Sequence, residues 1–121
     1  KTRNGLLLCI NGCGIAYSWL RKFPKDRSYN DLNLSAINTS IGSDNLKFYP
    51  FGNGSERLFN NKELGSHFIN LNFNVHDETH LIRSVQEGIA FSMCYGIEML
   101  KGLGVEVNTI RVGNANLFLS M

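Results

Sequence analysis

The sequence predicts an α/β or α+β fold, in which helices pack against a sheet. Three observations indicate this fold class. Short apolar runs bounded by glycine and asparagine alternate with helical patterns along the chain. One long helical pattern carries a continuous apolar stripe. The 121 residues are 43% hydrophobic and 18% charged, which is typical of one globular domain and excludes a strongly disordered or collagen-like chain.

The N-terminal part of the chain predicts a strand, a turn and a helix. Residues 5–11 form an apolar run that predicts a buried strand, and residues 12–14 predict a turn. A helix is expected from Ile15 until shortly before Pro24, because the residue before a proline disfavours helical backbone. The polar stretch that follows is expected to be irregular, with only a weak helical pattern over residues 32–37.

The middle of the chain predicts two strands separated by a long loop. Residues 46–50 are the first strand candidate, and residues 66–72 have the alternation of a second. Between them, residues 51–64 carry glycine, asparagine and charges without any periodicity. We expect a loop there, and loops of this length in compact domains are often functional.

The long helix is the most strongly predicted element. Its stripe consists of Leu81, Ile82, Val85, Ile89, Ala90, Met93, Ile97 and Leu100. Gly88 and Gly96 weaken such a helix by about 1 kcal/mol each relative to alanine, and we expect them to allow a neighbouring backbone to approach closely. Gly102 and Gly104 are expected to end the helix.

The start of this helix has several candidate caps. Asn74 or His76 is expected to cap it, and the acids Asp77 and Glu78 suit its positive N-terminal end. Beyond the helix, residues 105–112 predict another strand, residues 113–114 a turn, and the residues from 115 onward a final helix.

Charge and cysteine content limit the classes of function. The net charge of +2 is small for a nucleic-acid-binding protein, and no apolar run approaches the roughly 20 residues of a membrane span. Cys9, Cys13 and Cys94 make an odd number without a disulfide spacing, and the sequence context of Cys9 and Cys94 predicts small buried side chains. We therefore expect a cytoplasmic protein that binds neither nucleic acid nor membranes. Because the chain begins without Met and ends within an apolar pattern, we also expect it to be a segment of a larger protein.

His76 and His80 form a pair with the spacing of metal ligands on a helix. Four residues apart on a helix, they would share one face. A third ligand would have to come from Asp77, Glu78 or the distant His67, and the pattern matches no recognised zinc motif. The favoured interpretation is a solvated first turn without a metal.

Two strand–glycine–helix junctions, at residues 11–14 and at residues 112–116, are candidate phosphate-binding sites. Glycine lets the chain turn sharply and admits a ligand close to the backbone, and the N–H groups of a helix start attract phosphate. Asn114 and Asn116 add side-chain donors and acceptors suited to a purine or ribose. Neither junction is a dinucleotide-binding fingerprint or a P-loop, so each alone is also typical of an ordinary turn.

Glu56 and Arg57 are the charged candidates in the predicted loop. Two interpretations remain open: an ion pair between them that orders the loop, or a contact with a ligand. The spacing of serine, histidine, cysteine and aspartate indicates no nucleophilic catalytic set.

Residues 66–87 resemble the signature of the C-terminal domain of FGGY carbohydrate kinases. The matching positions are Ser66, Phe68, Leu71, His80, Leu81, Ser84, Val85 and Glu87. Asn70 stands where glycine is usual, and Gln86 where an apolar residue is usual. Three other stretches resemble the family in order and spacing: residues 14–20, with a glycine and a Trp-Leu pair; residues 50–57, with a Pro…Gly-Ser-Glu-Arg loop; and residues 110–116, a strand–glycine–helix turn. The loop and the tryptophan helix are most similar to those of xylulokinases.

The resemblance implies a fold and an activity. FGGY kinases transfer the γ-phosphate of ATP to a sugar hydroxyl with Mg²⁺, and have two ribonuclease-H-like, actin-like ATPase lobes around a cleft. Residues 1–121 would be an incomplete C-terminal nucleotide-binding lobe, with a mixed sheet and packed helices. Gly14 and Ser18 would line the nucleotide pocket, with Gly113, Asn114 and Asn116 at the adenine and ribose. Asn114 replaces the second glycine of the family's usual pair.

The family's catalytic aspartate and Gly-Thr phosphate hairpin have no counterpart in these residues. We therefore expect no catalytic residue and no catalysis from this chain alone, with a pentulose such as xylulose and ATP as substrates of the larger enzyme. A non-catalytic actin-like interaction module is the alternative. Unpaired sheet edges and the stripe over residues 81–100 also predict a homo-oligomer.

Overall fold

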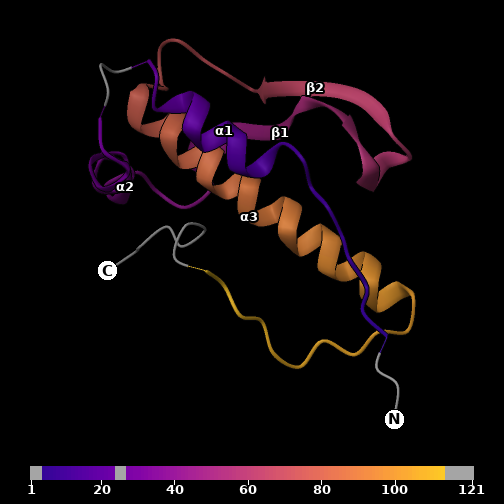
Figure 1. The fold of residues 1–121 in the computed structure, drawn as a ribbon. Helices are drawn as coiled ribbons and strands as arrows, with labels where there is room; N and C mark the ends of the chain where they lie inside the picture. Colours follow the sequence, from indigo (N-terminus) through magenta and orange to yellow (C-terminus); the bar gives the residue numbers. More distant parts are fainter. Residues whose placement is uncertain (1–3, 24–26, 114–121) are drawn as a thin grey trace.

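The computed structural model describes residues 4–23 and 27–113 (Figure 1). In chain order its elements are α1 (Cys13–Leu20), α2 (Tyr29–Ile37), β1 (Lys47–Glu56), β2 (Lys62–Ile69) and α3 (Glu78–Gly102). Two short 3₁₀ turns, η1 (Ser43–Asn45) and η2 (Arg57–Phe59), precede and follow β1. Within the described residues the structure is therefore an α/β arrangement, as the sequence predicts.

The sheet is an antiparallel hairpin of β1 and β2. Lys47 pairs with Ile69 and Glu56 with Lys62, and the register is irregular between Phe51 and Ser55. Helix α3 packs along β1, and α1 and α2 pack in turn on α3 (Figure 1). The expected mixed sheet is not observed, because the described residues contain only these two strands.

The core lies where the three helices meet β1. Its buried side chains are Cys13, Ala16, Tyr17, Leu20, Leu32, Ala36, Phe48, Ile82, Val85 and Ile89. The members from α1 have helical spacing, so one face of this short helix is buried. Most of the predicted stripe of α3 is buried or half-buried, whereas Ala90 is exposed.

Gly88 brings α3 and β1 together. A Cβ atom at this position would overlap the carbonyl oxygen of Phe48, so the close backbone approach expected from the sequence is confirmed. At Gly96 the neighbour is instead a side chain, because a Cβ there would overlap Leu8. Glycine at these two positions therefore lets β1 and the N-terminal segment pack closely on α3.

Only the N-terminal end of α3 differs from the prediction. Asp77, rather than Asn74 or His76, is the N-cap: its carboxylate accepts hydrogen bonds from the N–H groups of Thr79 and His80. The sequence analysis assigns Asp77 to the acids near the helix start, although aspartate is also a preferred N-cap residue. The helix ends at Gly102, and Gly104 has a φ of +81°, a conformation that favours glycine.

Three predicted segments are wrong. Residues 51–64 form the end of β1, η2 and the start of β2 instead of a loop, because the irregular register hides the alternation of a regular hairpin. Residues 5–11 and 105–112 form no strand, since no partner strand lies beside them among the described residues. Leu7, at 87% exposed, shows that the first of these segments is not buried. Gly113 is the last described residue, so the predicted turn at 113–114 is only partly covered and the predicted helix from 115 lies outside the described residues.

No helix among the described residues is both long and apolar enough to cross a membrane.

Candidate functional site

Helix α1 begins after Gly12, whose backbone packs directly against β1. A Cβ atom at Gly12 would overlap the carbonyl oxygen of Pro50, so only glycine fits at this N-cap. No side chain caps the helix, and its first N–H groups therefore have no side-chain acceptor within the described residues. At Gly14 a Cβ would meet no atom within 4 Å. The first glycine thus fixes the turn, and the second leaves the surface of the helix start open.

Glu56 fixes the approach to this helix. Its side chain is 1% exposed, and both carboxylate oxygens accept from the backbone N–H of Asn11, at 3.1 and 3.0 Å. The Asn11 side chain donates to the carbonyl oxygen of Ser55 at 2.7 Å. Arg57 is exposed, and no ion pair joins it to Glu56 among the described residues. Of the two interpretations left open by the sequence, the ion pair is therefore wrong, and Glu56 instead ties the end of β1 to the chain entering α1.

A small hollow of about 510 Å³ lies beside α1. The rings of Trp19, Phe48 and Phe68 are part of its lining, and Lys22 and Ser66 supply polar groups. Gly14 and Ser18 are not part of its lining. Gly14 and Ser18 are four residues apart and share one face of α1. Ile15 and Trp19, which line the hollow, lie on the neighbouring face. Two surfaces of α1 are therefore available: the hollow, and the open face that carries Gly14 and the half-buried Ser18.

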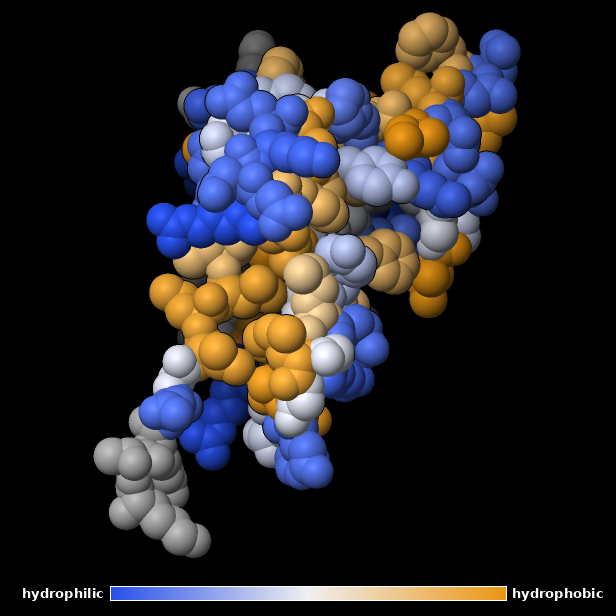
Figure 2. Space-filling view, turned by 90° about the vertical axis from the view of Figure 1, so that its right-hand side faces the viewer, coloured by the Kyte–Doolittle hydropathy of each residue, from blue (hydrophilic) through white to orange (hydrophobic). Residues whose placement is uncertain are grey.

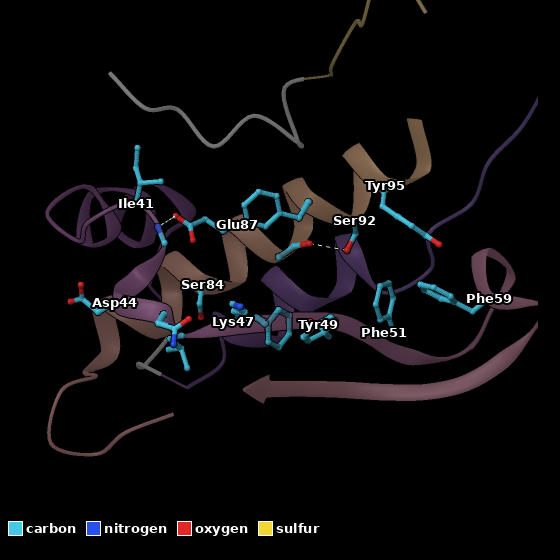
Figure 3. Close-up of a pocket in the computed structure, with 16 residues that line it drawn as sticks. Ile41, Asp44, Lys47, Tyr49, Phe51, Phe59, Ser84, Glu87, Ser92 and Tyr95 are labelled. Carbon is cyan, nitrogen blue, oxygen red and sulfur yellow. Dashed lines mark hydrogen bonds between the residues drawn. The ribbon is translucent and has the colours of Figure 1, made fainter. Parts of the chain in front are cut away.

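A larger groove of about 790 Å³ lies between α3 and β1 (Figure 3). Phe51, Phe59 and Tyr95 gather at one end, where the ring of Phe59 is 4.9 Å from that of Phe51 and 5.8 Å from that of Tyr95. Asp44 and Ile41 lie at the other end. Sequence reasoning missed this groove, although Phe91 and Tyr95, one turn apart and outside the predicted stripe, are a signal of a second apolar face.

The second predicted junction is only partly described. Gly113 is exposed at the end of a segment without regular structure, and a Cβ there would meet no atom within 4 Å. Asn114 and Asn116 lie outside the described residues. The meeting of the two junctions around one nucleotide remains a prediction.

The rings of His76 and His80 contact aspartate side chains and backbone groups. The ring of His80 contacts Asp77 Oδ1 at 2.8 Å and Asp44 Oδ2 at 3.1 Å. His76 accepts from the N–H of Asn72 and contacts the carbonyl oxygen of Asp44. Across residues 4–23 and 27–113, no group of three or more histidine, cysteine, aspartate or glutamate side chains is placed to hold a metal.

Cys13 is not an activated nucleophile. Burial raises the pKa of the Cys13 thiol to about 11, and the nearby Glu56 carboxylate adds to the rise, so the thiol is protonated at neutral pH. Cys9 is half-buried and Cys94 is exposed, so the prediction of a buried Cys94 is wrong. All three are free thiols.

Gln86 belongs to a polar cluster that sequence reasoning did not find. Its amide donates to the Tyr17 hydroxyl at 3.0 Å and to Asn33 Oδ1 at 3.1 Å, and the Tyr17 hydroxyl donates to the same oxygen at 2.6 Å. The cluster joins α1, α2 and α3. The departure from the family signature at Gln86 is therefore matched by polar partners.

Comparisons with known proteins place this architecture among sugar kinases. No family model matches the chain. The xylulose kinase of Staphylococcus epidermidis is 26% identical over 98 residues, which cover 80% of this chain and 20% of that protein. The ligand-bound xylulose kinase of Lactobacillus acidophilus has a TM-score of 0.63 at 30% identity, covering 69% of this chain and 17% of that one. Gluconate kinase from the same organism has a TM-score of 0.57 at 29% identity, covering 68% of this chain and 17% of that one.

The chain spans about a fifth of the length of the curated relatives it matches. The matches to xylulose kinases, in sequence and in structure, nevertheless extend over most of this chain. Together with the four motifs in their expected order, they make the chain similar to the xylulokinase-like members of the FGGY carbohydrate kinases.

Proposed function

We propose that residues 1–121 form part of the C-terminal nucleotide-binding lobe of an ATP-dependent sugar kinase that phosphorylates a pentulose such as xylulose. The observation that carries the proposal is the similarity to xylulose kinases over 80% of the chain. The relatives are also the basis for proposing the ribonuclease-H-like, actin-like fold for the complete lobe. In that fold, residues outside this chain supply the remaining strands of a mixed sheet.

The adenine nucleotide is proposed to bind between the two glycine junctions. Gly14 and Ser18 would contact it from α1, and Gly113, Asn114 and Asn116 from the second junction. The open surface at Gly14 and the absence of a side-chain cap on α1 support this proposal, because nucleotide groups can approach the backbone there. Glu56 and Arg57 then act differently: buried Glu56 positions the helix start, and exposed Arg57 is the candidate for a ligand contact.

The chemistry of the proposed reaction needs groups beyond this chain. Phosphoryl transfer depends on positioning and on Mg²⁺, which neutralises charge on the phosphates. Mg²⁺ in such sites is usually bound by substrate phosphates and one or two carboxylates. The residues of this chain would hold and orient the adenosine part of ATP, while the base and the sugar site would come from elsewhere in the enzyme.

The test compares Asn116→Ala with Asn30→Ala in the full-length protein. Asn30 is an exposed asparagine on α2, outside both junctions, and serves as the matched control. Loss of one hydrogen bond to bound nucleotide, worth about 1 kcal/mol, predicts a rise in the KM for ATP of roughly fivefold. The KM for xylulose should stay within about twofold in both variants.

Steady-state kinetics with ATP and xylulose distinguish the possible outcomes. An unchanged KM for ATP in Asn116→Ala would remove this residue from the nucleotide site. Absence of any ATP-dependent phosphorylation of xylulose, gluconate or related sugars by the full-length protein would instead favour the non-catalytic interaction module.

A further inference from the structure

The turn that joins α2 to β1 has an unusual backbone. Four consecutive residues, 42 to 45, have φ angles of +89°, +48°, +47° and +72°. Only the first is glycine; Ser43, Asp44 and Asn45 adopt a left-handed conformation that residues with a Cβ atom rarely adopt. Such a turn persists only where its surroundings hold it in place.

Several hydrogen bonds hold the turn against α3 and the loop before it. The buried Ser43 hydroxyl donates to the carbonyl oxygen of His80 at 2.7 Å. The Gly42 N–H donates to Glu87 Oε1 at 3.0 Å, on the side of the groove shown in Figure 3. The Asn70 amide donates to the carbonyl oxygen of Asn45 at 3.2 Å. None of these donors changes its protonation state near neutral pH.

Asp44 is the exception, because its partner is a histidine. Its Oδ2 lies 3.1 Å from His80 Nε2, and the other ring nitrogen, Nδ1, lies 2.8 Å from Asp77 Oδ1. A carboxylate can only accept, so the ring must donate from both nitrogens to satisfy both contacts. Only the imidazolium donates to both carboxylates. The backbone N–H of Asp77 also lies 3.2 Å from Nδ1, so a neutral ring protonated on Nε2 accepts there and keeps only an uncharged donor on Asp44, which makes a weaker bond than the imidazolium does. A neutral ring would turn a lone pair toward one of the two carboxylates.

We propose that His80 is a pH-sensitive latch: its imidazolium fastens the left-handed turn 42–45 to the first turn of α3, and loss of its proton loosens that turn. The turn lines one end of the large groove, so the latch also controls the shape of the groove's rim. Thr39, which donates to Thr79 at 2.9 Å, keeps the end of α2 at α3 when the latch is open.

The charges around His80 agree with this assignment. Asp44 faces it from η1 and Asp77 from the helix cap, and the ring of His76 lies 5.4 Å away. Two neighbouring charged pairs are already satisfied: Arg83 with Glu87 on the next turn of α3, at 2.8 Å, and Arg27 with Glu78 at 3.1 Å.

The sign of the pH dependence follows from the ring's surroundings. The hydrogen bond to Asp77 is the main cause that raises the pKa of His80; burial opposes the rise and the hydrogen bond to Asp44 adds to it. Because this pKa is raised in the folded protein, the latch is fully closed below the ordinary histidine pKa of about 6.5 and opens as the pH rises through the folded value. The side chains of Asp44 and Asp77 are 54% and 67% exposed, so solvent and salt weaken the effect.

His76 is an internal control in the same cluster. Its Nδ1 accepts from the Asn72 N–H and its Nε2 lies 3.1 Å from the carbonyl oxygen of Asp44. A single neutral tautomer satisfies both contacts, so His76 does not need to be charged to hold its place. The structure therefore assigns the pH sensitivity to His80.

Hydrogen–deuterium exchange of the full-length protein tests the latch. Peptides that cover residues 40–47 are followed from pH 5.5 to 8.5, with rates corrected for intrinsic exchange. We expect protection in these peptides to fall by about threefold as His80 loses its proton, and peptides from the middle of α3 to change little. In 0.5 M salt the step should shrink.

Asp44→Asn is the decisive variant, and Glu98→Gln is its control. Asp44 is exposed enough for the change to be tolerated, and the asparagine oxygen cannot attract an imidazolium as a carboxylate does. The variant should show low protection of residues 40–47 at every pH, and the NMR titration of ¹³C-labelled His80 should shift to a lower pKa. Glu98→Gln, which removes an exposed acid paired with Lys101 farther along α3, should behave as the unmodified protein. Protection that is constant with pH in the unmodified protein, or an identical pH profile in Asp44→Asn, would overturn the proposal.

Discussion

At the residue scale, the cluster of Tyr17, Asn33 and Gln86 explains how an amide fits at a position that the family signature fills with an apolar side chain. The Gln86 side chain is 8% exposed, and both of its recorded acceptors come from other helices. A buried amide without partners is costly, whereas here the three side chains satisfy one another. Gln86 therefore selects the mutual positions of α1, α2 and α3.

Gln86→Leu tests this role. The substitution removes a donor from the buried Tyr17 hydroxyl and from Oδ1 of half-buried Asn33, so the free energy of unfolding should fall by about 1–3 kcal/mol. Urea denaturation followed by circular dichroism measures it. A stability equal to that of the unmodified chain in this variant would show that the cluster contributes nothing.

At the element scale, the contact between α3 and β1 depends on one missing side chain. Gly88 lies in the middle of a helix, where glycine is unfavourable by about 1 kcal/mol relative to alanine. The structure gives the compensation: the carbonyl oxygen of Phe48 occupies the space that a Cβ would need. The unfavourable helix propensity is therefore the cost of packing β1 directly on the helix backbone.

Gly88→Ala should consequently destabilise the protein although it improves helix propensity. The strand must move away from the helix, and overpacking of this kind costs about 1–3 kcal/mol, more than the propensity gain. Gly102→Ala, at the open end of the same helix, is the matched control and should be neutral or slightly stabilising. Urea midpoints of the two variants decide the matter, and a more stable Gly88→Ala protein would contradict the close packing.

The same elements show what the sequence could predict. Helix α3 is confirmed because a long apolar stripe has only one structural interpretation. Residues 51–64 of the hairpin are predicted as a loop because the register of β1 is irregular near Gly54. This irregularity removes the alternation of apolar and polar residues from which a strand is predicted. In the candidate site, the closeness of Gly12 to β1 and the role of Glu56 depend on contacts across about 40 residues, which local patterns do not contain.

At the scale of the whole molecule, two extended segments explain both the wrong strand predictions and the exposed apolar surface. Residues 5–11 and 105–112 have strand-like composition, yet neither pairs with a strand among the described residues. Figure 2 shows apolar side chains gathered on the side where the N-terminal segment meets the end of α3. The exposed apolar residues of these parts are Leu6, Leu7, Leu103, Ile110 and Val112.

Unpaired backbone beside exposed apolar side chains promotes association, so we expect the 121-residue chain by itself to form oligomers. The predicted stripe of α3 is an unsuitable contact, because all of its residues except Ala90 are buried or half-buried within the molecule. The extended segments are the better candidates, and Leu7→Lys with Ile110→Lys should disrupt the contact by placing charges on both. Asn38→Lys with Asn30→Lys adds the same charge at exposed positions elsewhere and should leave the association unchanged. Light scattering over a range of concentrations gives the average mass: a chain that stays monomeric throughout, or a double lysine variant at 7 and 110 that associates as strongly as the unmodified chain, would show that these segments do not carry the contact.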